Sequence, residues 1–108
     1  MSRLNIDRVD FGFRVFQIEY RPRHFSDDGT HYYGTVDYTA GKIILETEHA
    51  DDDTKVTLLH EICHVIESMY QICGETPDEQ RVEFYAQGFA MVFRLNPKIA
   101  KLFSDVGR

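Results

Sequence analysis

The sequence is poor in the features that mark several specialised classes of protein. It has no tryptophan, three prolines and two cysteines in 108 residues. Two cysteines are too few for the disulfide framework of a small secreted protein, which favours a reduced, cytoplasmic setting. The first residues form no apolar signal peptide, and no run of about 18 apolar residues marks a membrane span. We therefore expect no membrane partner.

Positive charge is also scarce. The chain has 12 Lys and Arg against 18 Asp and Glu, a net charge of −6. Nucleic-acid-binding domains usually carry a basic face, so we expect no nucleic-acid partner. Hydrophobic residues make up 43% of the chain, which is enough for a packed core without disulfides. The length predicts a single domain over residues 1–108.

The first half of the chain, residues 1–50, predicts a sheet. Residues 13–20, 32–38 and 43–46 are rich in β-forming side chains and are bounded by turn residues. The last two segments are spaced for a hairpin. We therefore expect a short, twisted, three-stranded sheet.

The second half changes to a helical period. Residues 51–73 begin with three aspartates and then place apolar residues three and four apart. These apolar residues form two faces: Val56, Leu59, Cys63 and Ile66, and Leu58, Ile62, Val65 and Met69. A helix that is apolar on most sides is expected to be buried. A second helix is predicted over residues 76–96, with Thr76 as N-cap, and a short third helix over 97–104. The fold class is therefore α+β.

The most informative motif is His60-Glu61-Ile62-Cys63-His64, an HExxH sequence. Two histidines four residues apart lie one turn apart on the same helix face, so both imidazoles can bind one Zn²⁺. Glu61 then lies beside the metal, where it can take a proton from a bound water and pass it to a leaving amine. We predict zinc as the cofactor, His60 and His64 as ligands, and Glu61 as the catalytic residue.

A catalytic zinc site usually has three protein ligands. No histidine follows His64, which leaves a downstream carboxylate. Glu79 and Glu83 are one turn apart on the second predicted helix and can face the same way. If Glu79 is the ligand, Glu83 is placed to hold a ligand histidine. If Glu79 only completes a capping box with Thr76, Glu83 becomes the ligand.

A peptidase also needs a group that stabilises the oxyanion. The candidates are His31, Tyr32, Tyr38, His49, Tyr70 and Tyr85, and the sequence does not choose among them. His24 and His31 are expected in surface loops. Residues 43–46, just before the helix, are expected to pair with an extended substrate by edge addition.

The segment from Thr57 to His64, followed by Glu79-Gln80-Arg81-Val82-Glu83, resembles the ImmA/IrrE family of small metallopeptidases, especially the stand-alone forms encoded by phages and prophages. Gly88 and Asn96-Pro97 fit the end of the same pattern, so the resemblance covers about the C-terminal half. It implies a minimal zincin-like fold, a gluzincin-like site and peptidase activity. Longer members carry Ala-Asn after the ligand glutamate, where this chain has Val82-Glu83.

We therefore predict a zinc-dependent endopeptidase that hydrolyses a peptide bond in a regulatory protein, with zinc-bound water as the nucleophile. The family's theme implies a protein or peptide substrate such as a phage or mobile-element repressor. The alternative is a phage-encoded binding protein, or pseudo-peptidase, that sequesters a regulator without cleaving it. The intact Glu61 favours the enzyme, because a purely structural two-histidine site has no need of that acid.

Overall fold

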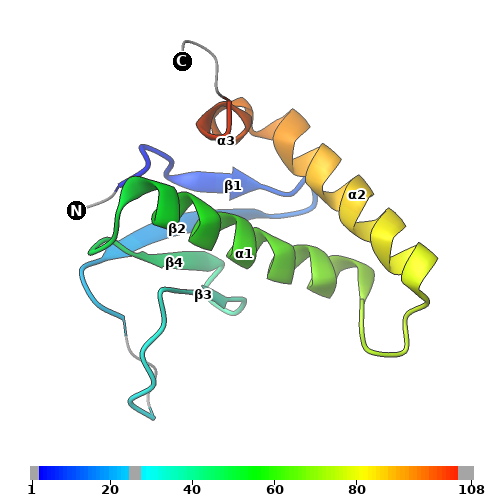
Figure 1. Cartoon of the computed structure of the whole chain (residues 1–108), viewed down its shortest axis with the longest axis horizontal. Coiled ribbons are helices and arrows are strands. Elements are labelled where there is room, and N and C mark those ends of the chain that lie inside the picture. The colour runs from blue at the N-terminus through cyan, green and yellow to red at the C-terminus, as the bar shows by residue number, and fades with distance from the viewer. Residues whose placement is uncertain (1–2, 25–27, 105–108) are drawn as a thin grey trace.

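The computed structural model describes residues 3–24 and 28–104. The protein has an α+β fold in which a four-stranded mixed sheet is followed by two main helices (Figure 1). The elements in chain order are β1 (Arg8–Asp10), β2 (Val15–Arg21), β3 (Gly34–Asp37), β4 (Lys42–Glu46), α1 (Asp51–Tyr70), α2 (Asp78–Leu95) and α3 (Pro97–Leu102).

Strand β4 occupies an interior position in the sheet. The strand order is β1-β2-β4-β3, with β4 parallel to β2 and antiparallel to β3. The predicted hairpin of residues 32–38 and 43–46 is confirmed. The expectation that residues 43–46 offer an edge to a substrate is wrong, because both sides of β4 are already paired. The edge strand on this side of the sheet is β3.

The sequence does not predict strand β1, which is why three strands were expected and four are found. β1 has three residues and pairs antiparallel with β2. A tight turn joins the two strands, in which the Phe11 N–H donates to the Arg14 carbonyl at 2.9 Å and Gly12 has φ 88°. A strand of three residues is too short to display a recognisable alternation.

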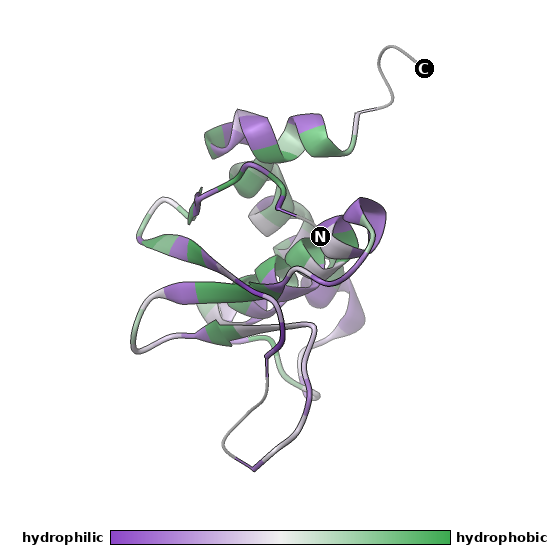
Figure 2. Ribbon diagram, turned by 90° about the vertical axis from the view of Figure 1, so that its left-hand side faces the viewer, coloured by the Kyte–Doolittle hydropathy of each residue, from purple (hydrophilic) through white to green (hydrophobic). Residues whose placement is uncertain are grey.

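Helix α1 lies across one face of the sheet and contacts β3 and β4 (Figure 1). Hydrophobic and hydrophilic residues alternate along the strands, as Figure 2 shows, so one sheet face is apolar. The centre of the core is formed by buried residues from both layers: Phe16, Ile18, Ile43, Leu45, Leu58, Ile62, Val65 and Ile66. This packing fixes which side of α1 faces the sheet.

The prediction that α1 is buried on most sides is wrong. Leu58, Ile62, Val65 and Ile66 form the single buried apolar stripe, whereas Val56 is 64% exposed. His60 and His64 lie outside this stripe and are exposed as well. The two apolar faces read from the sequence cannot both meet a sheet that covers only one side of the helix.

The helix ends differ from the predicted ones by a few residues. α1 begins at Asp51 but ends at Tyr70, because Gln71 adopts a left-handed conformation with φ 54°. α2 begins after Pro77, and no side chain caps it. The Thr76 hydroxyl instead accepts the Cys73 N–H at 2.9 Å, so the predicted capping box is not formed. α3 ends at Leu102 rather than 104. None of the helices within the described ranges has the length and apolarity needed to cross a membrane.

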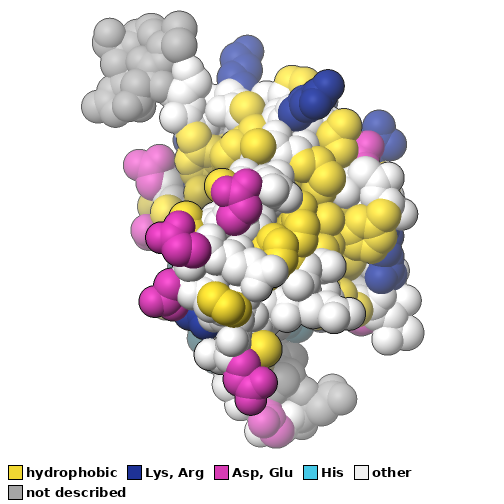
Figure 3. All heavy atoms as spheres, turned by 90° about the vertical axis from the view of Figure 1, so that its right-hand side faces the viewer, with side chains coloured by type: hydrophobic (Ala, Val, Ile, Leu, Met, Phe, Trp, Pro, Cys, Tyr) yellow, Lys and Arg dark blue, Asp and Glu magenta, His cyan; other side chains and the backbone are white. Residues whose placement is uncertain are grey.

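Helix α2 packs against α1 at a glycine. Gly88 is buried, and a Cβ atom placed there would lie 2.6 Å from Cγ2 of Ile66. The rings of Tyr70 and Phe84 stack between the same two helices, with centroids 4.8 Å apart. Val82, by contrast, is 66% exposed. Figure 3 shows hydrophobic side chains gathered on this side of the molecule, with acidic side chains along one margin.

We expect Gly88→Ala to destabilise the protein. Alanine ordinarily stabilises a helix interior by about 1 kcal/mol relative to glycine, but here its methyl group would overlap Ile66, whose branched side chain is fully buried. Overpacking of this kind costs roughly 1–3 kcal/mol, so the free energy of unfolding in urea should fall.

Gly74→Ala is the matched control, because no atom lies within 4 Å of its added Cβ. Its free energy of unfolding should stay within about 0.5 kcal/mol of the wild-type value. A gain in stability from Gly88→Ala would show that the two helices are not in close contact at this point.

Candidate metal site

The side chains of the HExxH motif converge on one side of α1. His60 Nε2 and His64 Nε2 lie 3.1 Å apart, and the rings meet at 79°. Both histidines are exposed, whereas Glu61 between them is 5% exposed. One ligand atom from each of the three residues fits within a 4.8 Å span. Among the described residues, this is the only group of three or more His, Cys, Asp or Glu side chains that meets that condition.

The spacing of the two imidazole nitrogens fits a zinc ion. Two nitrogens that are each about 2.1 Å from a tetrahedral zinc lie roughly 3.4 Å apart, close to the 3.1 Å between the Nε2 atoms. The same distance suits an N–H···N hydrogen bond between two neutral rings. The tautomer of each ring decides between the two arrangements. The tautomer is set by the hydrogen-bond partner of Nδ1, the ring nitrogen that does not face the other histidine.

Glu67 determines the tautomer of His64. Nδ1 of His64 donates to Oε1 of Glu67 at 3.0 Å, which leaves the lone pair of Nε2 available to a metal. The Tyr85 hydroxyl donates to the other Glu67 oxygen at 2.5 Å. The hydrogen bond from Tyr85, and then that from His64, holds the pKa of Glu67 below its ordinary value. The same bond to Glu67 raises the pKa of Tyr85 to about 12.

Sequence reasoning missed Glu67 in this role and gave it to Glu83. The available signal was local, because a carboxylate three residues after a histidine lies next to it on the helix. From the sequence, Tyr85 is one of the candidates for oxyanion stabilisation and also part of an apolar stripe on the second helix. The structure instead places it in a chain of hydrogen bonds that ends at His64.

We expect Glu67→Gln to weaken zinc binding about tenfold, because partners that orient a ligand histidine typically contribute 10–100-fold to metal affinity. Competition with a chromophoric chelator measures this change. Glu75→Gln removes an exposed acid that lies outside the cluster and should leave the affinity unchanged. Equal affinities for wild type and Glu67→Gln would contradict the role given to Glu67.

Glu61 is buried where α1 meets the edge strand. A Cβ atom on Gly34 of β3 would lie 3.2 Å from Cγ of Glu61 and 2.7 Å from Cγ2 of Thr57. Burial raises the pKa of Glu61, and the charges of His64 and His60 oppose this shift. A carboxylate with a raised pKa is suited to accept and return a proton near neutral pH.

A cleft of about 410 Å³ lies beside the motif. It is lined by His60, Glu61 and His64 from α1 and by Tyr32, Gly34, Thr35, Val36 and Tyr38 from the segment around β3. The Tyr38 hydroxyl donates to the His64 carbonyl at 3.1 Å. Burial and the nearby Glu61 carboxylate raise the pKa of Tyr38. The cleft therefore has one wall from the helix and one from the edge strand.

The six candidates for oxyanion stabilisation are separated by the fold. Tyr32 and Tyr38 line the cleft. Tyr70 stacks on Phe84 and Tyr85 binds Glu67, so both serve the packing of α2 against α1. His31 and His49 bind Glu46. Of the six, only the first two line the cleft that His60 and His64 share.

Neither predicted third ligand lies within the histidine group. Glu79 and Glu83 are both exposed, and Glu83 accepts a hydrogen bond from Gln87 at 2.8 Å. Tyr85 faces α1, where it binds Glu67. Glu83 lies two positions earlier on α2 and is therefore rotated by about 200° around the helix axis relative to Tyr85. In this conformation neither carboxylate lies within 4.8 Å of both imidazoles. The assignment of the third ligand stays a prediction.

The other three histidines of the chain surround a second buried carboxylate. Glu46 is 3% exposed, and its oxygens accept hydrogen bonds from the rings of His31 and His49 at 2.6 Å each and from the His24 N–H at 2.9 Å. The His24 ring also contacts the Thr35 hydroxyl at 2.8 Å. His24 is buried, so the expectation that it lies in a surface loop is wrong.

This second cluster should make stability depend on pH. Burial alone raises the pKa of Glu46, but the hydrogen bonds from His24, His31 and His49 hold it below its ordinary value. A carboxylate with a lowered pKa in the folded state stabilises the protein above its unfolded-state pKa, about 4.3. That contribution is lost as the pH falls through the folded-state pKa.

We expect Glu46→Gln to lower the free energy of unfolding by roughly 1–3 kcal/mol at about pH 7. The glutamine side chain has an NH₂ group in place of one oxygen, so at least one of the donors from His24, His31 and His49 loses its acceptor. The difference from wild type should shrink as the pH is lowered below about 4.3, the unfolded-state pKa, because the wild-type carboxylate then loses its charge as well. Urea denaturation at about pH 7 and at a series of lower pH values measures this difference. Glu19→Gln, which breaks partly exposed ion pairs with Arg21 and Lys42, should cost less than the loss at Glu46, because each exposed pair contributes less than about 1 kcal/mol. A difference in stability that stays the same across the pH series would contradict the assignment.

In comparisons with known proteins, no protein family, curated protein or solved structure matches this chain. The interpretation of the site therefore depends on the contacts of its own residues. Among those contacts, the paired Nε2 atoms of His60 and His64 beside the buried Glu61 point most directly to a chemistry.

Proposed function

We propose that this chain is a zinc-dependent endopeptidase of the ImmA/IrrE type that its motifs resemble, with a minimal zincin-like fold. The observation that supports the proposal most directly is the 3.1 Å separation of the His60 and His64 Nε2 atoms next to the buried Glu61 carboxylate. The cleft beside them gives a substrate access to all three side chains. The proposed substrate is a regulatory protein such as a repressor, in the cytoplasm.

His60 and His64 would hold the zinc ion through Nε2, and Glu67 would keep His64 in the required tautomer. When bound, zinc lowers the pKa of a water and polarises the scissile carbonyl. Glu61 takes the proton from the attacking water and then gives it to the leaving amine. The burial of Glu61 supports both steps, because it raises the pKa of the carboxyl group. A raised pKa makes the carboxylate a better proton acceptor, and the carboxylic acid that forms can then donate the proton to the leaving amine.

The edge strand is the proposed docking position for the substrate. Gly34, Thr35 and Val36 of β3 line the cleft, and β3 pairs with β4 on its other side. An extended peptide can add to such an edge through main-chain hydrogen bonds. The scissile bond would then lie next to His60 and His64. The hydroxyl of Tyr32 or Tyr38 would donate a hydrogen bond to the oxyanion.

Glu79, or alternatively Glu83, remains the proposed third ligand. Neither carboxylate lies within 4.8 Å of both imidazoles, so this part of the proposal requires a movement of the side chain or of α2 when the metal binds. Among the described residues, neither Glu79 nor Glu83 joins the group of His60, Glu61 and His64. This observation favours the alternative function, a binding protein without peptidase activity. In that case the chain binds a regulator without cleaving it.

The decisive variant is Glu61→Gln. It should bind zinc like the wild type but cleave a mixed peptide library at least about 100-fold more slowly, because general acid–base catalysis contributes 10²–10⁴-fold. Cleavage is followed by mass spectrometry, and zinc content by elemental analysis of untagged protein. His60→Ala is the companion variant, which should lose both the metal and the activity.

Two outcomes contradict the enzyme assignment. Equal cleavage by Glu61→Gln and wild type would show that another group, or a contaminating peptidase, performs the reaction. Wild-type protein that carries a full equivalent of zinc and cleaves nothing, yet captures a repressor, would favour the binding protein.

A further inference from the structure

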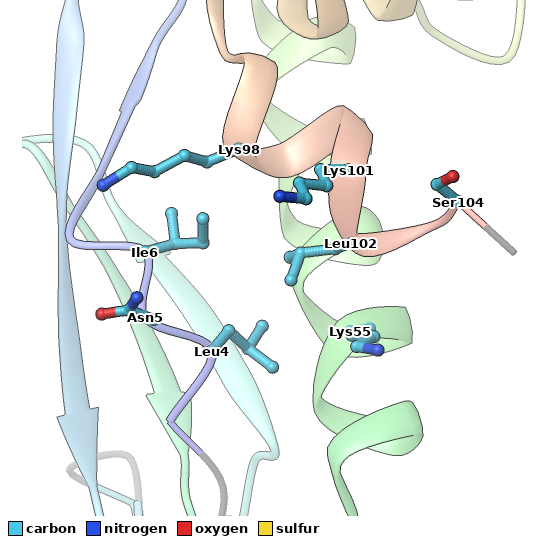
Figure 4. Close-up of a pocket in the computed structure, with 8 residues that line it drawn as sticks. All are labelled: Leu4, Asn5, Ile6, Lys55, Lys98, Lys101, Leu102 and Ser104. Atoms are coloured by element: carbon cyan, nitrogen blue, oxygen red, sulfur yellow. The ribbon is translucent and has the colours of Figure 1, made fainter. Parts of the chain in front are cut away.

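A second hollow lies between the N-terminal segment, α3 and the first turns of α1 (Figure 4). It has a volume of about 460 Å³ and shares no lining residue with the cleft beside His60. Its lining includes Lys55, Lys98 and Lys101, which are three of the four lysines in the chain. We refer to this hollow as the lysine pocket.

The lysine pocket also has an apolar part. Leu4 and Ile6 are 7% and 5% exposed, and Leu102 is half-buried. Figure 4 shows Leu4 and Leu102 directed toward each other across the hollow, and the Lys98 and Lys101 side chains extending from α3 toward the N-terminal segment. Aliphatic side chains therefore lie next to ammonium groups, an arrangement suited to a ligand with both kinds of surface.

Few close ion pairs neutralise the lysines of the lysine pocket. Lys98 and Lys101 form no ion pair within the described part of the chain. Lys55 has only Asp52 at 3.8 Å, and the Asp52 side chain is 96% exposed, so this pair is weak. In a protein with a net charge of −6, such a gathering of cations favours an anion at this position.

We propose that the lysine pocket binds a small molecule that carries one anionic head group on an apolar body, such as a medium-chain carboxylate. The head group lies between Lys98 and Lys101, and the apolar body lies against Leu4, Ile6 and Leu102. The volume of the pocket is within the range of small-molecule sites, about 300–1,000 Å³. This binding does not depend on the HExxH motif.

Titration of the protein with octanoate, followed by calorimetry and by amide and methyl NMR, tests the proposal. Octanoate should bind saturably, and the methyl signals of Leu4, Ile6 and Leu102 should shift. 1-Octanol, which lacks the charge, and inorganic phosphate, which lacks the apolar body, should each bind at least about tenfold more weakly.

The double variant Lys98→Gln/Lys101→Gln should also weaken octanoate binding at least about tenfold, because both partners of the head group lose their charge. Both residues are exposed, and an unchanged melting temperature confirms that the variant is folded. Lys42→Gln is the matched control. It removes the fourth lysine, which lies on β4 and pairs with Glu19 of β2, and should keep the wild-type affinity.

Three results would overturn the proposal. In the first, the methyl shifts of the wild-type protein fail to saturate or fall outside the pocket. In the second, Lys42→Gln weakens binding as much as the double variant, which indicates a non-specific charge effect. In the third, 1-octanol or phosphate binds as tightly as octanoate, so that only one half of the pocket contributes.

Discussion

The close approach of α1 to the edge strand β3 is the constraint on which the candidate site depends. Gly34 makes it possible, because any side chain there would meet Thr57 and the stem of Glu61. The approach buries the Glu61 carboxylate, while His60 and His64, one position before and three after it, stay on the open side of the helix. A single helix therefore presents a shielded acid between two accessible bases.

Strand β3 also connects the two histidine clusters of the molecule. Successive residues of a strand face opposite sides of the sheet. Gly34 faces α1 and Glu61 of the candidate metal site, whereas the next residue, Thr35, binds the His24 ring of the cluster around Glu46. Strand β3, which forms one wall of the cleft, thus contacts α1 on one face. On the other face, Thr35 binds His24, which in turn binds the buried Glu46 carboxylate.

The parts that the sequence predicted depend on residues close together in the chain. The helical period, the hairpin and the meeting of His60 with His64 are of this kind. The interior position of β4 was not predicted, because it follows from parallel pairing with β2, and β3 lies between these two strands in the sequence. The hydrogen bond of Glu83 to Gln87 was also not predicted, since it depends on how α2 is rotated against α1, where Gly88 packs on Ile66. Local spacing carries no information on such long-range contacts.

The exposure of both imidazoles affects which ion the proposed metal site would hold. A pair of solvent-facing nitrogens on adjacent helical turns exchanges its ion readily with the surroundings and selects little by shape. Copper binds such donors more tightly than zinc does, so occupancy inside a cell would follow metal supply. If the proposed site binds metal, immobilised nickel would retain even untagged protein through His60 and His64, and the ion found afterwards would reflect the resin.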